Sequence, residues 1–408
     1  MSAPPGGAGP APADRRARVV EAVLPSLRRS ALFVLVAAAG WAVAAGRGWT
    51  DVHRSAGYLT VATALLAVGL FASTHGIDLA AARRNLRLVL LAVTVGVLVK
   101  AALISAVMYL AFGRPAFLVL GVAVAQIDPL SFAATRLRSR MSGQAQSILS
   151  AWASFDDPVT VLLTVYAAAW VVPALPGDPA GPTAADLGGF TLSLARNALL
   201  AAVAAVAWWG TRALHRWAAT RTRWVGRAVT VGQLVALLGL AALAVTQFLL
   251  LGLAVAGLFY RPPIGPVLDL LTRWAFLAAT FALGLVLVGG VDPVPGVVLG
   301  LAAVAAHVVV ASVICARLPA ADRLDVLLGQ QNGITAVVLA LVLERQFVGT
   351  VAVVAPAILV VNLVHALTNG LREASGRGGP GPAPAGSASA VRPRRRSGRS
   401  PAPDVPAH

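Results

Sequence analysis

Charged residues are scarce in this sequence, and their scarcity excludes a soluble protein. They make up 12% of the 408 residues, whereas hydrophobic residues make up 58% and the mean hydropathy is +0.79. A soluble domain of this length has too small a core to bury so many apolar side chains. The chain is therefore predicted to be an integral membrane protein whose apolar helices lie in the lipid bilayer.

Several other features are absent. The single cysteine, Cys315, excludes an internal disulfide. We find no zinc-ligand motif, phosphate-binding glycine loop or nucleophile elbow in a suitable context, and so expect neither an enzyme nor a cofactor. The net charge of +17 does not indicate nucleic acid, because the basic residues are spread over short loops and a tail. The N-terminal segment lacks the apolar core and cleavage site of a secretory signal, so we expect it to stay in the cytoplasm.

Apolar runs in the sequence predict twelve transmembrane helices. A helix needs about 20 apolar residues to cross the hydrocarbon core of a bilayer. The runs, numbered as spans one to twelve, lie at residues 31–46, 56–74, 88–112, 116–134, 145–171, 190–209, 228–246, 248–260, 270–290, 294–315, 324–344 and 349–371.

The distribution of arginine between the loops orients these spans. With both termini in the cytoplasm, most loop arginines fall on the cytoplasmic side, as the positive-inside rule requires. We therefore expect a multi-pass protein of the plasma membrane. Residues 1–30 and the basic residues 373–408 have too little apolar surface to fold, and we expect both to be disordered cytoplasmic tails. They flank a transmembrane domain at residues 31–372.

Four ionisable side chains fall deep inside the predicted spans. They are the carboxylates of Asp128, Asp156 and Asp157 and the ammonium of Lys100, the only lysine in the chain. Charge inside a bilayer is costly, and its presence there indicates function. Helical rise places Lys100 and Asp157 each about 18 Å from the cytoplasmic end of its span. Both are thus expected at similar depth, near the midplane.

Polar residues interrupt two of the predicted spans. The fourth, "VAVAQIDPLSFAATR", is broken by Gln126, Asp128 and Pro129. The eleventh is broken by Gly329, Gln330, Gln331, Asn332 and Gly333. Such non-helical backbone is tolerated at membrane depth only where protein or a water-filled cavity surrounds it. Because these are the middle members of spans three to five and ten to twelve, they indicate a secondary transporter built from inverted repeats.

Three stretches resemble motifs of the cation/proton antiporter superfamily. "GVAVAQIDPLSFAATR" resembles its "GAxxAxTDPVAVxxxL" span, and "QSILSAWASFDDPVTVLLTVY" resembles the following span, which carries an Asn-Asp or Asp-Asp pair. "GQQNGITAVVLALVL" is similar to the "GLRGAVxLALAL" span of sodium/proton exchangers. The order and spacing of the motifs also agree, so that the resemblance covers approximately residues 57–371.

The resemblance implies an all-α inverted-repeat antiporter fold in which the two broken helices cross. It further implies a mobile core domain, formed by spans at about 88–171 and 294–371, and a dimerisation domain, hence a homodimer. The family's conserved aspartate falls on Asp157, the expected ion ligand and proton carrier. The position before it, Asn in many electroneutral members and Asp in electrogenic ones, is Asp156 here. Asp128 is expected near the helix crossing.

The sequence departs from the family pattern at three positions. Electroneutral exchangers pair a glutamate with an arginine, at positions that are Trp152 and Asn332 here. The joint loss of both fits the removal of an ion pair, since either alone would be an unpaired buried charge. Electrogenic members carry a lysine in the tenth span, which here offers only His307. Lys100 can take that role toward Asp156, or it can make a purely structural pair.

Oxygen-bearing side chains near the acidic pair suit a small hard cation. Asp157, Asp128, Ser154 and Thr160 are the candidate ligands, and a proton competes with the cation for the same carboxylate. We therefore predict exchange of Na⁺ or Li⁺ for protons, in the service of pH homeostasis. The same carboxylates serve K⁺/H⁺ exchange equally well. The missing ion pairs leave open a sensor or passive channel that retains the fold.

Overall fold

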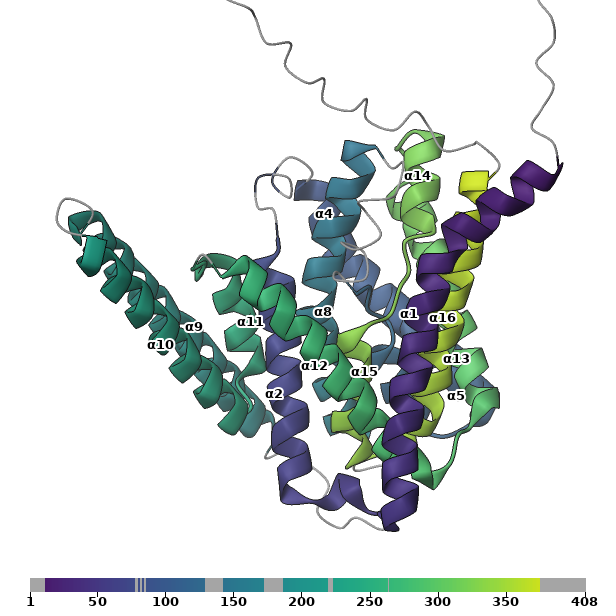
Figure 1. Cartoon of the computed structure of the whole chain (residues 1–408), viewed down its shortest axis with the longest axis horizontal. Helices are drawn as coiled ribbons and strands as arrows, with labels where there is room; N and C mark the ends of the chain where they lie inside the picture. Colours follow the sequence, from purple (N-terminus) through teal and green to yellow (C-terminus); the bar gives the residue numbers. More distant parts are fainter. Residues whose placement is uncertain are drawn as a thin grey trace, which may run out of the picture.

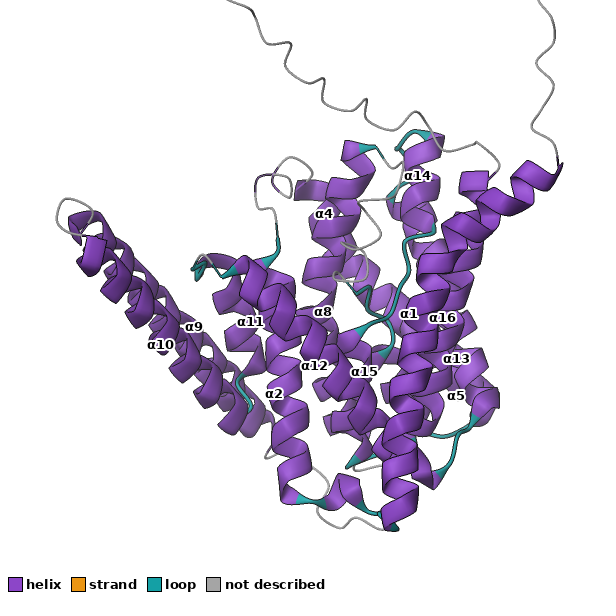
Figure 2. Ribbon diagram, viewed as in Figure 1, coloured by secondary structure: helices purple, strands orange, loops and turns teal. Residues whose placement is uncertain are grey.

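The structure, a computed structural model, describes residues 12–77, 80, 83, 86–128, 142–171, 186–218, 223–262 and 264–374. Regular structure within these residues is helical throughout, and Figure 2 shows no strand among them. Pro129, which the sequence placed in the break of the fourth span, lies outside the described residues.

The helices follow one another along the chain, and Figure 1 labels all of those named here except α6. They are α1 (Pro12–Arg47), α2 (Ala56–His75), α4 (Leu86–Leu91), α5 (Val97–Phe112), α6 (Ala116–Ala123), α8 (Gly143–Val171), α9 (Asp186–Ala218), α10 (Arg223–Thr246), α11 (Leu250–Phe259), α12 (Gly265–Val286), α13 (Pro293–Ile314), α14 (Ala320–Leu327), α15 (Ile334–Glu344) and α16 (Thr350–Ala374). A π-helical turn (Ala92–Gly96) joins α4 to α5.

All twelve predicted spans coincide, wholly or in part, with helices of the described residues. Nine helices are long and apolar enough to cross a membrane, namely Ser26–Arg47, Gly57–His75, Leu86–Phe112, Gly143–Val171, Thr191–Leu214, Arg227–Thr246, Gly265–Gly289, Pro293–Ile314 and Thr350–Arg372. The fourth, eighth and eleventh spans correspond to the shorter helices α6, α11 and α15. The predicted all-α architecture is confirmed.

The division between the seventh and eighth spans is also confirmed. Helix α10 ends at Thr246 and α11 begins at Leu250. Between them Phe248 adopts a positive φ of 55°, a conformation that interrupts a right-handed helix. The 27-residue apolar stretch at 234–260 therefore turns back on itself instead of forming one long helix.

The first helix differs from its prediction. Residues 12–30, expected to belong to a disordered tail, are helical and continue into the first span. The physical reason lies in their composition, because Ala, Arg, Leu and Glu favour helix and Pro12 occupies a first position that proline tolerates. Residues 12–30 are polar and basic, but they are helical because they continue directly into the apolar helix of the first span.

The helices form one bundle from which α9 and α10 project as a hairpin (Figure 1). Helix α1 packs along α12 and α16, and α13 packs against α16 and α5. The hairpin contacts the other helices chiefly through α11 and α2. The described chain begins and ends at the same end of the bundle, as an even number of spans requires.

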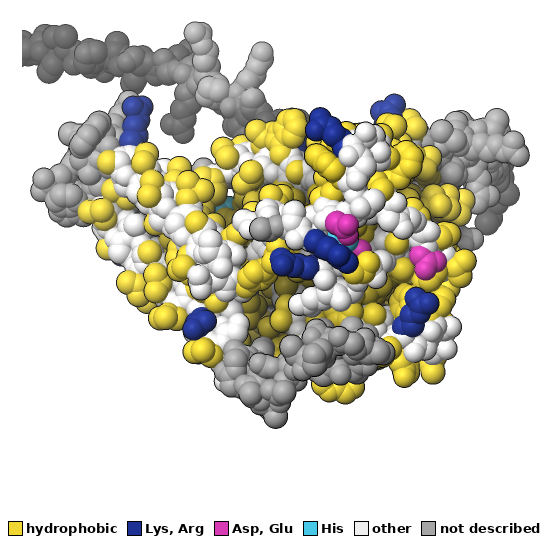
Figure 3. Space-filling model, turned by 90° about the horizontal axis from the view of Figure 1, so that it is seen from below, with side chains coloured by type: hydrophobic (Ala, Val, Ile, Leu, Met, Phe, Trp, Pro, Cys, Tyr) yellow, Lys and Arg dark blue, Asp and Glu magenta, His cyan; other side chains and the backbone are white. Residues whose placement is uncertain are grey.

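Large apolar side chains face outward over much of the molecule. Leu110, Trp170 and Val313 are 84%, 78% and 72% exposed, and hydrophobic side chains cover much of the face in Figure 3, where the charged side chains lie in small groups. Exposure on this scale would be unfavourable in water. Together with the apolar helices it identifies a multi-pass membrane protein.

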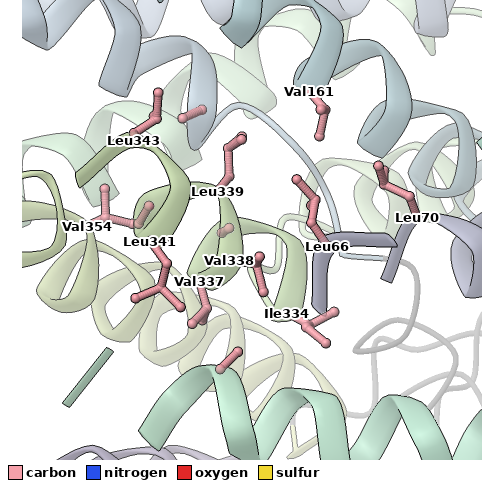
Figure 4. Packing of buried hydrophobic residues seen from close by; sticks show 14 of the residues in the cluster. Leu66, Leu70, Val161, Ile334, Val337, Val338, Leu339, Leu341, Leu343 and Val354 are labelled. Carbon is pink, nitrogen blue, oxygen red and sulfur yellow. The ribbon is translucent and has the colours of Figure 1, made fainter. Parts of the chain in front are cut away.

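Helix α15 lies at the centre of the apolar core. Leu66 and Leu70 of α2 and Val161 of α8 lie beside Ile334 and Leu339 of α15 (Figure 4). Ten of the eleven residues of α15 are buried, so that protein, not lipid, surrounds the helix. A helix buried on all sides can be apolar around its whole circumference and need not match the thickness of the bilayer.

Glycine permits a close approach where α1 crosses α12. A side chain at Gly40 would collide with the backbone oxygen of Phe281, and one at Gly284 with the backbone oxygen of Ala37. Small residues commonly bring membrane helices together in this way, because lipid offers no hydrophobic gain on helix association.

We predict that Gly40→Ala destabilises the protein by about 1–3 kcal/mol, the usual cost of overpacking. Gly46→Ala is the matched control, since it lies on the same helix with nothing within 4 Å of the added carbon. It should keep or slightly raise stability, because alanine favours helix over glycine. Thermal unfolding of the detergent-solubilised protein measures both. Equal midpoints for the two variants would contradict a tight crossing.

Candidate ion-binding site

The two broken spans cross and satisfy each other's backbone. The segment at 124–128 that follows α6 meets the segment at 328–333 between α14 and α15. The Asp128 N–H donates to the Gln331 carbonyl oxygen at 2.8 Å, and Gln330 Nε2 donates to the Gln126 carbonyl oxygen at 2.9 Å. The predicted polar residues Gln126, Gln330, Gln331 and Asn332 are all buried here. Non-helical backbone thus finds its partners inside the protein.

Asn362 of α16 holds the crossing from a third span. Its Nδ2 donates to the Asn332 carbonyl oxygen at 2.8 Å, and its Oδ1 accepts the Asn332 N–H at 3.1 Å. These two bonds satisfy both backbone groups of Asn332, which lies at the family's arginine position. Amide hydrogen bonds, and no charged side chain, therefore hold the backbone at this position.

Two carboxylates gather at the first turn of α15. Asp157 Oδ2 accepts a hydrogen bond from Thr335 Oγ1 at 3.0 Å. We assign the Gln126 amide in the orientation that satisfies both of its ends: its oxygen then accepts the Ala336 N–H at 2.7 Å and its NH₂ group donates to Asp157 Oδ1 at 3.0 Å. The Asp128 carboxylate lies against Gly333, where any side chain would collide with it. The N-terminus of a helix carries a partial positive charge and stabilises nearby anions. The N-terminus of α15 therefore stabilises the charged form of both carboxylates.

Asp156 points to another helix and pairs with Lys100. The Lys100 Nζ lies 2.7 Å from Asp156 Oδ2, and both side chains are 0% exposed. The same oxygen accepts the Ile127 N–H at 2.9 Å. Consecutive residues of a helix point about 100° apart. For this reason Asp156 contacts Lys100 of α5, whereas Asp157 contacts Thr335 of α15. The tenth span of this chain has no lysine to pair with Asp156. In the structure Lys100, from the third span, makes that pair.

Trp152, at the family's glutamate position, covers this pair. The Lys100 Nζ lies 5.7 Å from the centroid of the Trp152 ring, within the range of a cation–π interaction. The indole also packs against the His307 ring, with centroids 5.2 Å apart and the two planes tilted by 44°. An apolar, aromatic residue has thus replaced a charged one beside the ammonium.

The histidines of the tenth and twelfth spans bind backbone carbonyls. His307 Nε2 lies 2.9 Å from the Val326 oxygen, and His365 Nδ1 lies 2.8 Å from the Leu328 oxygen. Both oxygens belong to the last turn of α14 or the residue after it, where helical carbonyls lack intrahelical partners. These contacts place both histidines at the broken end of α14, and His307 makes no described contact with Asp156.

Proline opens the helix that carries the acidic pair. Pro158 has no N–H group, so the carbonyl oxygen of Ser154, four residues earlier, has no donor within α8. Ser73 Oγ of α2 donates to that oxygen at 3.2 Å. Ser154 thus contributes a backbone oxygen at the site, while Thr160 lies buried one turn beyond Asp156 on the same helix.

Sequence reasoning missed Thr335 and Ser73. Thr335 follows the polar run of the eleventh span by two residues, in the first turn of α15, and a hydroxyl at a helix start beside a break was the available signal. Ser73 lies in an apolar helix of the second span, where no pattern distinguishes it from other buried hydroxyls.

Comparison with known proteins agrees with this geometry. No protein-family model and no curated protein matches the sequence. Among solved structures, the fold is similar to that of the sodium proton antiporter MjNhaP1 from Methanocaldococcus jannaschii, determined at pH 8, with a TM-score of 0.56. The match covers 88% of this chain and 98% of that chain at 13% identity. The chain has the fold of a sodium/proton antiporter. At this identity the match establishes an antiporter fold and no more than the fold.

We predict strong coupling between Lys100 and Asp156. Lys100→Met and Asp156→Asn should each destabilise the protein by about 3–5 kcal/mol, because each leaves a buried charge without its partner. The double variant should cost much less than the sum. The measurement is thermal unfolding, in detergent, of the wild type, the two single variants and the double variant. If the losses of stability of the single variants add up to that of the double variant, the two charges do not interact.

Proposed function

We propose that the chain exchanges a monovalent cation, Na⁺ or Li⁺, for protons across the membrane, with Asp157 as the shared site. The observation that carries the proposal is the presence of two buried carboxylates, Asp157 and Asp128, at the first turn of α15 where the broken spans cross. Its support from comparison is the antiporter fold, found in a protein described as a sodium proton antiporter.

The chemistry follows from repulsion between two buried carboxylates. Neither is well solvated, and both cannot stay charged side by side without a positive partner. A proton on Asp157 removes one charge, and a small hard cation between the carboxylates compensates it, with oxygen ligands that such ions prefer. The two carriers exclude each other, because each neutralises the same carboxylate. This competition couples their fluxes.

Alternating access then depends on the charge of the core. The proposed core, at about 88–171 and 294–371, contains both broken spans and the acidic pair. Moving it with Asp157 charged and uncompensated would drag a bare charge through an apolar interface, which is costly. Moving it with either a proton or a cation bound avoids that cost. Exchange, in preference to leak, is the consequence.

The environment of the protein follows the same proposal. We place the chain in the plasma membrane as a homodimer with cytoplasmic termini, because the arginine-rich loops favour this orientation and the antiporter fold favours the dimer.

We predict that Asp157→Asn abolishes cation-dependent dissipation of a pH gradient by the purified protein in liposomes. Asn keeps the size of the side chain but neither titrates nor compensates a cation. Asp292→Asn, an exposed carboxylate at the start of α13, is the matched control and should retain full activity. A series with Li⁺, Na⁺ and K⁺ identifies the cation. Exchange by Asp157→Asn at the wild-type rate would refute the assignment.

We predict that exchange moves net charge. Asp156 is of the residue type that the resemblance links to electrogenic exchange, and it pairs with a lysine, so that Lys100 can release a second proton in each cycle. Clamping the membrane potential of the liposomes with K⁺ and valinomycin should then change the rate of Na⁺/H⁺ exchange. A rate independent of the potential would mean that the pair is only structural, while the role of Asp157 would stand.

A further inference from the structure

Helix α2 forms a wall of the candidate site, although no residue of α2 was expected there. Gly69 and Ser73 lie one turn apart, on the same face of α2. A side-chain carbon at Gly69 would stand 3.7 Å from Thr335 Oγ1 and 3.6 Å from Ile334 Cγ2. Leu66 and Leu70 of the same helix pack beside α15 (Figure 4). This face of α2 therefore reaches the first turn of α15.

The Ser73 hydroxyl differs from its neighbours in what it contacts. Thr63 and Thr74, also buried in α2, donate to carbonyls of their own helix, as hydroxyls in apolar helices commonly do. Ser73 is 2% exposed and donates across the helix interface to the Ser154 oxygen at 3.2 Å. Ser154 lies one turn before Asp157 on α8, so that this contact brings Ser73 to the part of α8 that carries the acidic pair.

We propose that Ser73 is a cation ligand supplied by α2, and that it determines the affinity and selectivity for the transported ion. A hydroxyl that donates its proton keeps lone pairs for a cation, and small hard cations take several oxygen ligands. Ser73 Oγ lies 3.2 Å from the Ser154 carbonyl oxygen that Pro158 frees, and Thr335 Oγ1 lies 3.0 Å from Asp157 Oδ2, one turn further along α8. This inference rests on the proposed exchange function.

The location of Ser73 gives this ligand a distinct role. Asp157, Ser154 and Thr335 all lie in the proposed moving core, whereas α2 lies outside it. A core that moves must break its contact with Ser73, so the ligand set is complete only in the arrangement seen here. Ser73 should therefore affect how tightly the cation binds more than how fast the loaded core moves.

The test is the kinetics of Na⁺/H⁺ exchange by Ser73→Ala in liposomes. We expect KM for Na⁺ to rise about 3- to 10-fold, the factor for losing one modest polar contact, with kcat within about twofold of the wild type. Cysteine is nearly the same size as serine but is a poor ligand for hard cations. Ser73→Cys should therefore raise KM for Na⁺ as Ser73→Ala does. Ser73→Thr, which restores the hydroxyl, should recover KM. Thr63→Ala is the control on the same helix and should leave KM unchanged.

The outcomes separate this inference from the function on which it rests. If the wild-type chain exchanges Na⁺ and Ser73→Ala keeps the wild-type KM, Ser73 merely caps the Ser154 carbonyl and the inference is wrong. If Ser73→Ala unfolds more easily but binds Na⁺ normally, the same conclusion follows. If the wild-type chain shows no cation/proton exchange at all, the proposed function fails and the ligand role fails with it.

Discussion

Backbone N–H and C=O groups within a membrane need partners inside the protein, and this requirement governs the centre of the molecule. Helices satisfy it internally, but the stretches at 124–128 and 328–333 do not. They satisfy it by crossing, with the bond from Asp128 N–H to the Gln331 oxygen at its centre. The crossing fixes where α15 begins, and the start of α15 fixes what its first turn faces. The acidic pair of α8 owes its surroundings to that arrangement.

Asp156 and Asp157 are adjacent on α8 but differ in how their charges are compensated. Asp156 meets a lysine and a backbone N–H, so its charge is compensated by the protein itself. Asp157 meets uncharged donors, among them Thr335 and Gln126, and Asp128, another carboxylate, lies at the same end of α15. Its compensation has to come from outside, as a proton or as a cation. One buried charge thus has a partner within the protein, and the other is open to a proton or a cation.

Much of this could be predicted from the sequence, because apolar length and misplaced polar residues are strong signals in a membrane protein. The twelve runs, the break near Phe248 and the burial of Gln330 and Asn332 all followed from them. The helix at residues 12–30 did not, since a polar composition says little about a segment that an adjoining apolar helix extends. Ser73 and Thr335 are ordinary hydroxyls in sequence, and only the packing of α2 and α15 brings them to the acidic pair.

The central claim is that Asp157 holds either a proton or a cation, and proton release on cation binding tests it most directly. Adding Na⁺ to the detergent-solubilised protein in a weakly buffered solution, at a pH where Asp157 is protonated, should release protons from the wild type. The account predicts release from the wild type and from Asp292→Asn, and none from Asp157→Asn. Saturable Na⁺ binding by the wild type without proton release would contradict it.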